Sequence, residues 1–201
     1  MAMKIIGITG PTGAGKTTAL RELEELGAAV IDADAVYHRL LREDRALGDR
    51  LEELFGPLRG ADGEIDRKKL GGIVFSDPSK LEQLNEVAQR ATADRIQGLL
   101  QAHEAGGGEV AAVDAIALLE SPLAALCTAT VAVLAPPETR VRRIMAREGI
   151  PEDYAWARVR AQKGDDFYQK GCTHVLVNDG EDPAAFAAQA RTLFRDIIEP
   201  H

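Results

Sequence analysis

The chain contains Gly10-Pro11-Thr12-Gly13-Ala14-Gly15-Lys16-Thr17, a complete G-x-x-x-x-G-K-[ST] pattern. Glycines allow backbone conformations that other residues avoid, so successive N–H groups can turn toward one anion. The helix expected to start near Gly15 adds the positive end of its dipole, Lys16 can reach the β- and γ-phosphates, and the Thr17 hydroxyl can ligate Mg²⁺. The stretch therefore predicts a site for a nucleoside triphosphate with magnesium.

The segments on either side of this pattern meet its structural requirements. Residues 4–9 (KIIGIT) form a short apolar run that predicts a buried strand, and residues 16–26 (KTTALRELEEL) carry leucines at helical spacing up to Gly27. A second short strand is expected at 28–32 (AAVID). Strand, helix and strand in such close succession predict a βαβ unit and a parallel sheet, a context that a chance glycine-rich turn would lack.

The rest of the chain divides into a helical insertion and further α/β segments. Residues 35–105 read as helices separated by turn signals, with almost no strand-like runs. Strands are expected at 109–114, 129–135 and 174–178, with charged helices at about 138–148 and 152–163 and a closing helix at about 182–198. We predict an α/β fold with a five-stranded parallel sheet flanked by helices. Its domains are a core at 1–34 and 106–201, with a helical lid at about 138–165, and the insertion at 35–105.

Composition narrows the class of protein further. The chain has 201 residues, is 45% hydrophobic and carries a net charge of −8. Such an acidic chain lacks the basic surface of a nucleic-acid or anionic-membrane binder, so phosphate must be held by a local cationic site. The cysteines, Cys127 and Cys172, show neither zinc-ribbon nor disulfide-framework spacing and fit a reducing cytoplasm. No apolar run approaches the roughly 18 residues of a membrane-spanning helix.

Among P-loop proteins, these features favour a small-molecule kinase. A GTPase needs an N-K-x-D guanine motif, which the sequence lacks. A chain of this length with a helical insertion and a separate arginine-rich helical pair is typical of kinases in which one subdomain binds the acceptor and a lid closes over the donor phosphates. We therefore predict a P-loop kinase with a helical acceptor-binding insertion and a helical lid.

Two carboxylates follow the second strand, in Asp32-Ala33-Asp34. Ligands of open parallel sheets bind beyond the carboxyl ends of the strands, which favours Asp34 as the base that orients the acceptor hydroxyl and Asp32 as a structural or metal-proximal group. The alternative is that these residues cap the next helix. Asp114 ends another apolar strand, where it can either hold a magnesium ligand, as a Walker B aspartate does, or cap a helix.

Arginines are concentrated in residues 138–163, against the acidic character of the whole chain. Arg143 and Arg147 are i,i+4 neighbours, which places them on one face of a helix, where two guanidinium groups could clamp phosphate oxygens. The alternative is a solvated helix face paired with Glu138, Glu148 and Glu152.

The sequence resembles the dephospho-coenzyme A kinase family over nearly its whole length. The matching pieces occur in order and include KIIGITGPTGAGKT, LGAAVIDAD, IVFSDPSKLEQLN, VDAIALLES, APPETRVRRIMAREG, Gln162 in RAQK, and HVLVNDG. The resemblance implies a P-loop kinase fold with a CoA-binding helical domain and a lid, and the reaction ATP + 3′-dephospho-CoA → ADP + CoA. Two departures lie on the acceptor side, where Gln89-Arg90 stands in place of His-Pro and Ile116 in place of proline.

Residue by residue, the resemblance assigns Asp34 as the catalytic base and Arg143 as the lid arginine, acting with Lys16. Thr17 and Asp114 are the expected magnesium ligands. The residues expected to bind ATP are Thr12, Gly13, Ala14, Gly15, Lys16, Thr17, Arg147 and Asn178, the last at the start of a loop beside the adenine.

Two alternatives remain at the level of sequence. One is a P-loop kinase of another small molecule, a nucleotide or nucleoside, and the other is a catalytically inactive nucleotide-binding regulator. The joint presence of Lys16, Thr17, Asp34 and Arg143 argues against the regulator, which would need no base. We expect a cytoplasmic enzyme, a monomer or weak oligomer, that uses ATP and dephospho-CoA and binds neither nucleic acid nor membrane.

Overall fold

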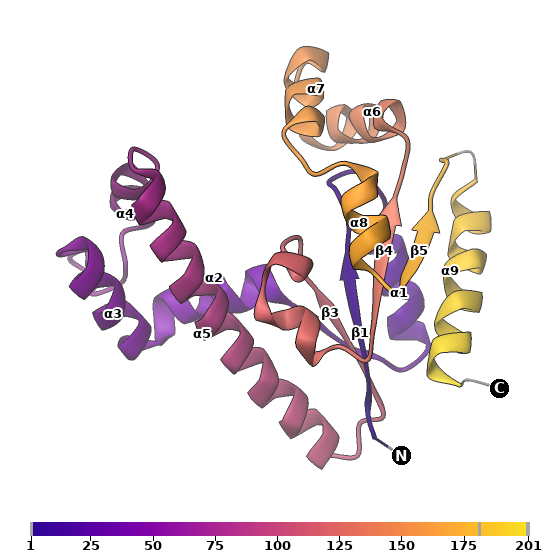
Figure 1. The fold of residues 1–201 in the computed structure, drawn as a ribbon, viewed down its shortest axis with the longest axis horizontal. Coiled ribbons are helices and arrows are strands. Elements are labelled where there is room, and N and C mark those ends of the chain that lie inside the picture. The colour runs from indigo at the N-terminus through magenta and orange to yellow at the C-terminus, as the bar shows by residue number, and fades with distance from the viewer. Residues whose placement is uncertain (1, 181, 200–201) are drawn as a thin grey trace. The chain divides into compact units, whose positions relative to one another are not determined.

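A computed structural model describes residues 2–180 and 182–199 (Figure 1). The chain forms two compact units: the core unit, Met1–Ile31 with Ala102–His201, and the insertion unit, Asp32–Gln101. From the sequence, the domain boundaries were expected after residues 34 and 105. The first of these falls inside the helix at Ala33–Glu43, and the second falls at the end of the helix at Pro78–Ala105. None of the helices in the described ranges is long and apolar enough to cross a membrane.

The core unit is built on a parallel sheet in the order β2-β3-β1-β4-β5. The central strand β1 pairs in parallel with β3 on one side and β4 on the other, and β4 pairs with β5. In this register Ile8 lies opposite Asp114, so the carboxyl ends of β1 and β3 meet at one edge. The five-stranded α/β sheet predicted from the sequence is confirmed, with strands at Lys4–Thr9 (β1), Ala29–Asp32 (β2), Val110–Asp114 (β3), Ala129–Leu134 (β4) and His174–Val177 (β5).

Helices cover both faces of this sheet, as a parallel sheet requires. On one face α1 (Lys16–Glu25) and α9 (Pro183–Ile198) bury Leu23 and Phe194 against the strand residues Ile6 and Ile8. On the other face Tyr168 of α8 (Asp165–Gly171) packs against Ala132 and Leu134 of β4. Figure 1 shows α9 beside β5 and α8 in front of β4.

Two further helices of the core unit, α6 (Pro137–Glu148) and α7 (Glu152–Arg160), pack against each other. Their interface buries Val141, Ile144, Ala155 and Val159. The helix expected at 152–163 ends at Arg160, three residues earlier than expected. The separate helix α8 after Gly164 was not expected from the sequence. The short 3₁₀ helices η1 (Leu118–Glu120) and η2 (Pro122–Leu126) between β3 and β4 were not expected either.

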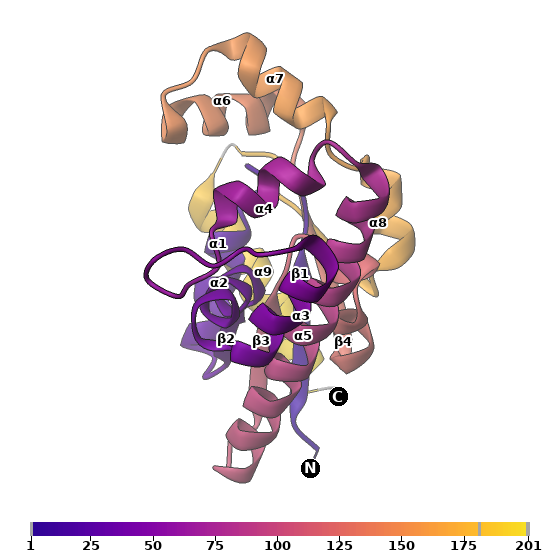
Figure 2. The same ribbon diagram turned by 90° about the vertical axis from the view of Figure 1, so that its left-hand side faces the viewer.

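The insertion unit contains α2 (Ala33–Glu43), α3 (Arg45–Phe55), α4 (Arg67–Val74) and α5 (Pro78–Ala105) up to Gln101, all labelled in Figure 2. Asp32, Asp44 and Asp66 are the N-caps of the first three, each accepting a hydrogen bond from a backbone N–H of the first turn. Their apolar faces enclose a second core that includes Leu51 and Leu58. Short aspartate-capped helices therefore account for the near absence of strands in this segment.

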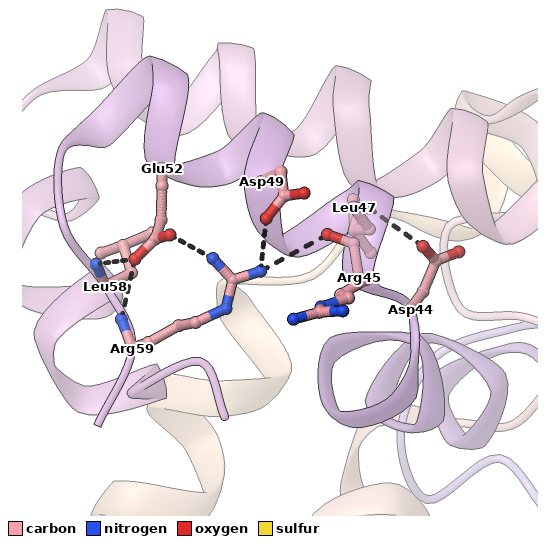
Figure 3. A network of polar contacts seen from close by, with 7 residues as sticks. All are labelled: Asp44, Arg45, Leu47, Asp49, Glu52, Leu58 and Arg59. Atoms are coloured by element: carbon pink, nitrogen blue, oxygen red, sulfur yellow. Dashed lines mark hydrogen bonds and ion pairs between the residues drawn. The ribbon is translucent and has the colours of Figure 1, made fainter. Parts of the chain in front are cut away.

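The loop after α3 is fastened to that helix by a polar network (Figure 3). One oxygen of the Glu52 carboxylate accepts the backbone N–H groups of Leu58 and Arg59 at 2.8 and 3.0 Å, and the other pairs with the Arg59 guanidinium. Arg59 also pairs with Asp49 at 2.7 Å and donates to the carbonyl oxygen of Arg45. The two backbone hydrogen bonds and the charge of Arg59 lower the pKa of Glu52 below its ordinary value.

We expect Glu52→Gln to lower the free energy of unfolding at neutral pH. Because the folded-state pKa is lowered, the stabilisation by the charged carboxylate is present above the unfolded pKa, near 4.3, and is lost as the pH falls through the folded value. Urea unfolding at several pH values should show the deficit of the variant shrinking below about pH 4. Glu53→Gln, which alters an exposed pair with Arg50, is the matched control. A loss in the free energy of unfolding of Glu52→Gln that is the same at every pH would contradict the charge-dependent role of Glu52.

Candidate active site

A cavity of about 340 Å³ in the core unit brings together most residues predicted for the site. It lies at the carboxyl ends of β1 and β3, the edge at which ligands of open α/β sheets bind. The loop between β1 and α1 forms one wall, and the end of β3 and helix α6 contribute the others. The lining residues are Pro11, Thr12, Gly13, Ala14, Gly15, Lys16, Thr17, Asp114, Ile116, Arg143 and Arg147.

Glycines permit the path of this loop. A Cβ on Gly10, whose φ is +136°, would lie 2.1 Å from the carbonyl oxygen of Val133 in β4. A Cβ on Gly13, whose φ is +82°, would lie 2.9 Å from the carbonyl oxygen of Arg140, and one on Gly15 would lie 2.3 Å from the side-chain nitrogen of Asn178. All three positions combine a left-handed backbone with a close neighbour, which only glycine tolerates.

The loop ends at the N-terminus of α1, where no side chain caps the helix. The N–H groups of Thr18 and Ala19 donate to the carbonyl oxygen of the N-cap Gly15, and the helix dipole makes this end electropositive. The ammonium group of Lys16 donates to the carbonyl oxygen of Gly10 at 3.1 Å, which folds its side chain back along the loop. Such an arrangement is suited to a phosphate group.

Arg143 and Asn178 hold the same loop by its carbonyl groups. The Arg143 guanidinium donates to the carbonyl oxygens of Gly13 and Ala14 at 3.1 and 3.3 Å, and to the Asn178 amide oxygen at 3.0 Å. Asn178, which is 5% exposed, donates to the carbonyl of Ala14 at 2.9 Å. Burial lowers the pKa of Arg143, with the neighbouring charge of Arg142 adding to the effect, yet an arginine remains charged at neutral pH.

Arg140 and Gln162 also contact the loop, although the sequence assigned neither a role. Both bind Thr12 with their side chains, from segments that are more than a hundred residues away in the chain. Arg140 was one of several arginines in a charged helix, and Gln162 was only part of the family resemblance. The excess of arginine in 138–163 was a signal for Arg140, but no local pattern identifies Gln162.

Arg147 lines the cavity but also pairs with Glu148 at 2.7 Å. Glu148 binds Arg158 of α7 as well, and these arginines lower its pKa. This pairing is the solvated-face arrangement that the sequence left open.

Thr17 and Asp114 fit a magnesium ion by their chemistry and position. A hydroxyl and a carboxylate are hard oxygen ligands, and both residues line the same cavity. The described ranges hold no group of three or more His, Cys, Asp or Glu residues that could hold a metal ion. Magnesium that shares phosphate oxygens and water with its ligand needs only one or two protein groups, so the pair is sufficient.

Asp32 and Asp34 belong to the insertion unit and have different surroundings. Asp32 caps α2, its carboxylate accepting the N–H of Ala35 at 3.0 Å. Asp34 is exposed in the first turn of the same helix and is not the cap. The capping alternative therefore applies to Asp32.

The sheet, the loop and the cationic cavity define a P-loop kinase. A profile of the dephospho-CoA kinase family matches residues 4–183. A dephospho-CoA kinase of Dehalococcoides mccartyi is 35% identical over 178 residues, 88% of this chain and 89% of the relative. A solved structure from Thermus thermophilus has a TM-score of 0.77 at 33% identity, with 100% of each chain covered. A Campylobacter jejuni dephospho-CoA kinase shares the fold, with a TM-score of 0.62 at 23% identity and 97% of each chain covered. This chain belongs to the dephospho-CoA kinase family.

We expect Gly13→Ala to weaken ATP binding and to lower the melting temperature. A Cβ there would lie 2.9 Å from the carbonyl oxygen of Arg140, which is backbone and cannot move aside cheaply. The matched control is Gly27→Ala, which has a similar φ of +88° but nothing within 4 Å of the new Cβ. Both variants carry the left-handed backbone cost of about 1–2 kcal/mol, so the difference between them isolates the contact. Equal ATP affinity and melting temperature in the two variants would show that the loop shifts to make room for the Cβ at residue 13.

Proposed function

We propose that the protein transfers the γ-phosphoryl group of ATP to the ribose 3′-hydroxyl of dephospho-CoA, giving ADP and CoA, as the last step of CoA biosynthesis. The observation that carries the proposal is the cavity that unites the complete phosphate loop with Asp114 and Arg143, in a chain of this family. Free cysteines and an acidic composition support a cytoplasmic enzyme.

The phosphate loop binds and aligns the donor. Its N–H groups, the N-terminus of α1 and the Lys16 ammonium surround the β- and γ-phosphates, and Arg147 contributes at the edge of the nucleotide. Asn178, expected from the sequence to bind ATP, does not line the cavity and supports the loop through the carbonyl of Ala14. Thr17 and Asp114 would hold Mg²⁺, which when bound neutralises charge on the phosphate oxygens. Arg143 places a further positive charge in the cavity wall, where negative charge on the transferred group is stabilised.

Asp34 acts on the acceptor. Phosphoryl transfer passes through a loose transition state, so a carboxylate need only orient the 3′-hydroxyl and accept its proton late. Asp32 is engaged as the cap of α2, whereas Asp34, also exposed and in the first turn of the same helix, is not the cap. A carboxylate that is not used to cap the helix supports Asp34 as the base.

The insertion unit contains a cavity suited to the acceptor. Its volume is about 660 Å³, and its walls combine leucine and valine side chains with three arginines, Arg50, Arg90 and Arg95, and three acidic residues, Asp44, Glu86 and Asp94. The apolar part of the wall suits a long, weakly polar arm, and the arginines among these charged groups could bind a pyrophosphate. Helix α5 runs unbroken for 28 residues through Arg90, where a proline would interrupt it.

The direct test is incubation of the protein with ATP, Mg²⁺ and dephospho-CoA, followed by ³¹P NMR of the product. A new monoester phosphate on the ribose 3′-hydroxyl is expected. Nucleoside monophosphates and nucleosides serve as competing acceptors in the same assay. Turnover of one of these without turnover of dephospho-CoA would indicate a different small-molecule kinase, and ATP binding with no turnover would indicate a regulator.

We expect Asp34→Asn to reduce kcat by roughly 10²- to 10⁴-fold, the usual contribution of a general base, with little change in ATP affinity. Asp32→Asn is the matched control two residues away, because asparagine caps a helix as well as aspartate does. Steady-state kinetics of both variants measure the contrast. Similar kcat values for the two variants would remove Asp34 from the base role.

We expect Arg90→Ala to raise the KM for dephospho-CoA by roughly 10- to 150-fold and to leave the KM for ATP nearly unchanged. The range corresponds to one charge-assisted hydrogen bond, about 1.5–3 kcal/mol. Arg42→Ala, at an exposed position outside the cavity lining, is the control. If the KM for dephospho-CoA is the same in wild type and Arg90→Ala, Arg90 is a surface residue.

A further inference from the structure

The backbone and side-chain polar groups of Thr12 are all bound by two side chains. Its N–H donates to the amide oxygen of Gln162 at 3.2 Å, and its hydroxyl accepts from the amide nitrogen of Gln162 at 2.8 Å. Its carbonyl oxygen accepts from the Nε of Arg140 at 3.0 Å. We call these three residues the Thr12 clamp. The polar groups of Thr12 are therefore engaged in hydrogen bonds within the protein, although Thr12 lies within the phosphate loop.

Arg140 completes the clamp from within the protein. Its side chain also donates to the amide oxygen of Gln162, so one oxygen serves both Thr12 and Arg140. Arg140 is 4% exposed, and within the described part of the chain no carboxylate lies at ion-pair distance from it. A buried guanidinium is costly unless its donors are satisfied, and here the carbonyl of Thr12 and the amide of Gln162 accept from it. The charge of Asp165 acts on the guanidinium from beyond ion-pair distance.

The clamp joins the loop to the helical pair α6–α7. Arg140 lies in α6, and its backbone lies so close to Gly13, the residue after Thr12, that a Cβ there would be 2.9 Å from its carbonyl oxygen. Gln162 lies two residues after α7, in the short link to α8. Because α6 and α7 share the buried cluster of Val141, Ile144, Ala155 and Val159, the two contacts to Thr12 come from one packed body.

We propose that Arg140 and Gln162 are positioning residues, which act through Thr12 to hold the phosphate loop in its anion-binding shape. The inference rests on the proposed nucleotide site. Since several N–H groups of the loop must converge on one phosphate, a small rotation at Thr12 misdirects those that follow it. Because the Thr12 clamp fixes the backbone of Thr12 before ATP binds, less conformational entropy is lost when ATP binds.

The test is ATP affinity measured by isothermal titration, together with the KM for each substrate. Gln162→Leu removes both contacts to Thr12 and leaves a buried donor of Arg140 unsatisfied, so we expect the Kd for ATP to rise by about 10- to 100-fold. The KM for dephospho-CoA should stay within about twofold of wild type, because the acceptor does not depend on the loop. Gln169→Leu, at an exposed position of α8, is the matched control.

Conservative variants separate positioning from general support of the fold. Gln162→Glu keeps oxygens that accept from Thr12 and Arg140, so ATP affinity should return to within about threefold of wild type. Thr12→Val removes the hydroxyl and should cost about two- to tenfold, whereas Thr12→Ser should restore binding. In the double variant Thr12→Val with Gln162→Leu, the losses should be less than multiplicative, because both remove one shared contact.

Each outcome bears on one claim. Wild-type protein that does not bind ATP would contradict the proposed function. If wild type binds ATP and Gln162→Leu binds it equally well, the Thr12 clamp does not support ATP binding. Losses of ATP affinity that simply multiply in the double variant would contradict the proposal as well. The positioning role would also be contradicted if Gln162→Glu bound ATP as weakly as Gln162→Leu. It would be contradicted as well if Gln162→Leu weakened ATP and dephospho-CoA binding equally and lowered the melting temperature.

Discussion

One tight turn of the backbone, from β1 into α1, constrains the rest of the core unit. The chain passes so close to Val133 and Arg140 that no side chain fits at Gly10 or Gly13. This turn leaves N–H groups on one side for an anion and presents carbonyl groups on the other. These carbonyl groups need hydrogen-bond donors, and the side chains of Arg140, Arg143 and Asn178 supply them.

These donors also explain how an acidic protein handles phosphate. The chain carries a net charge of −8, yet two arginines of α6 lie directly against the loop. Neither of their loop contacts depends on a carboxylate, since the acceptors are carbonyl groups and side-chain amides. Because carbonyl and amide acceptors carry no net charge, these contacts do not neutralise the two arginines. A local field of this kind attracts a polyphosphate without requiring a basic surface.

The sequence predicted what local patterns encode. The glycine spacing, with the strand before it and the helix after it, predicted the loop. The further apolar runs predicted the five-stranded sheet and the place of Asp114 at the end of β3. Contacts between distant segments left no such trace: Thr12 meets Gln162 across 150 positions, and Asn178 meets Ala14 across 164. Asp32 and Asp34 have equal capping chemistry in sequence, so only the observed hydrogen bond to Ala35 shows that Asp32 is the cap. The end of α7 at Arg160 was missed because the helical pattern continues past it.

The central claim is that the phosphate loop is already ordered before nucleotide binds. Hydrogen exchange of the Thr12 and Ala14 amides, followed by NMR on nucleotide-free protein, tests it most directly. Thr12 donates to Gln162 and Ala14 to the carbonyl of Pro11, so both amides should exchange slowly, and ATP with Mg²⁺ should change their rates little. Exchange as fast as in an unstructured chain, slowed only after ATP is added, would contradict the account.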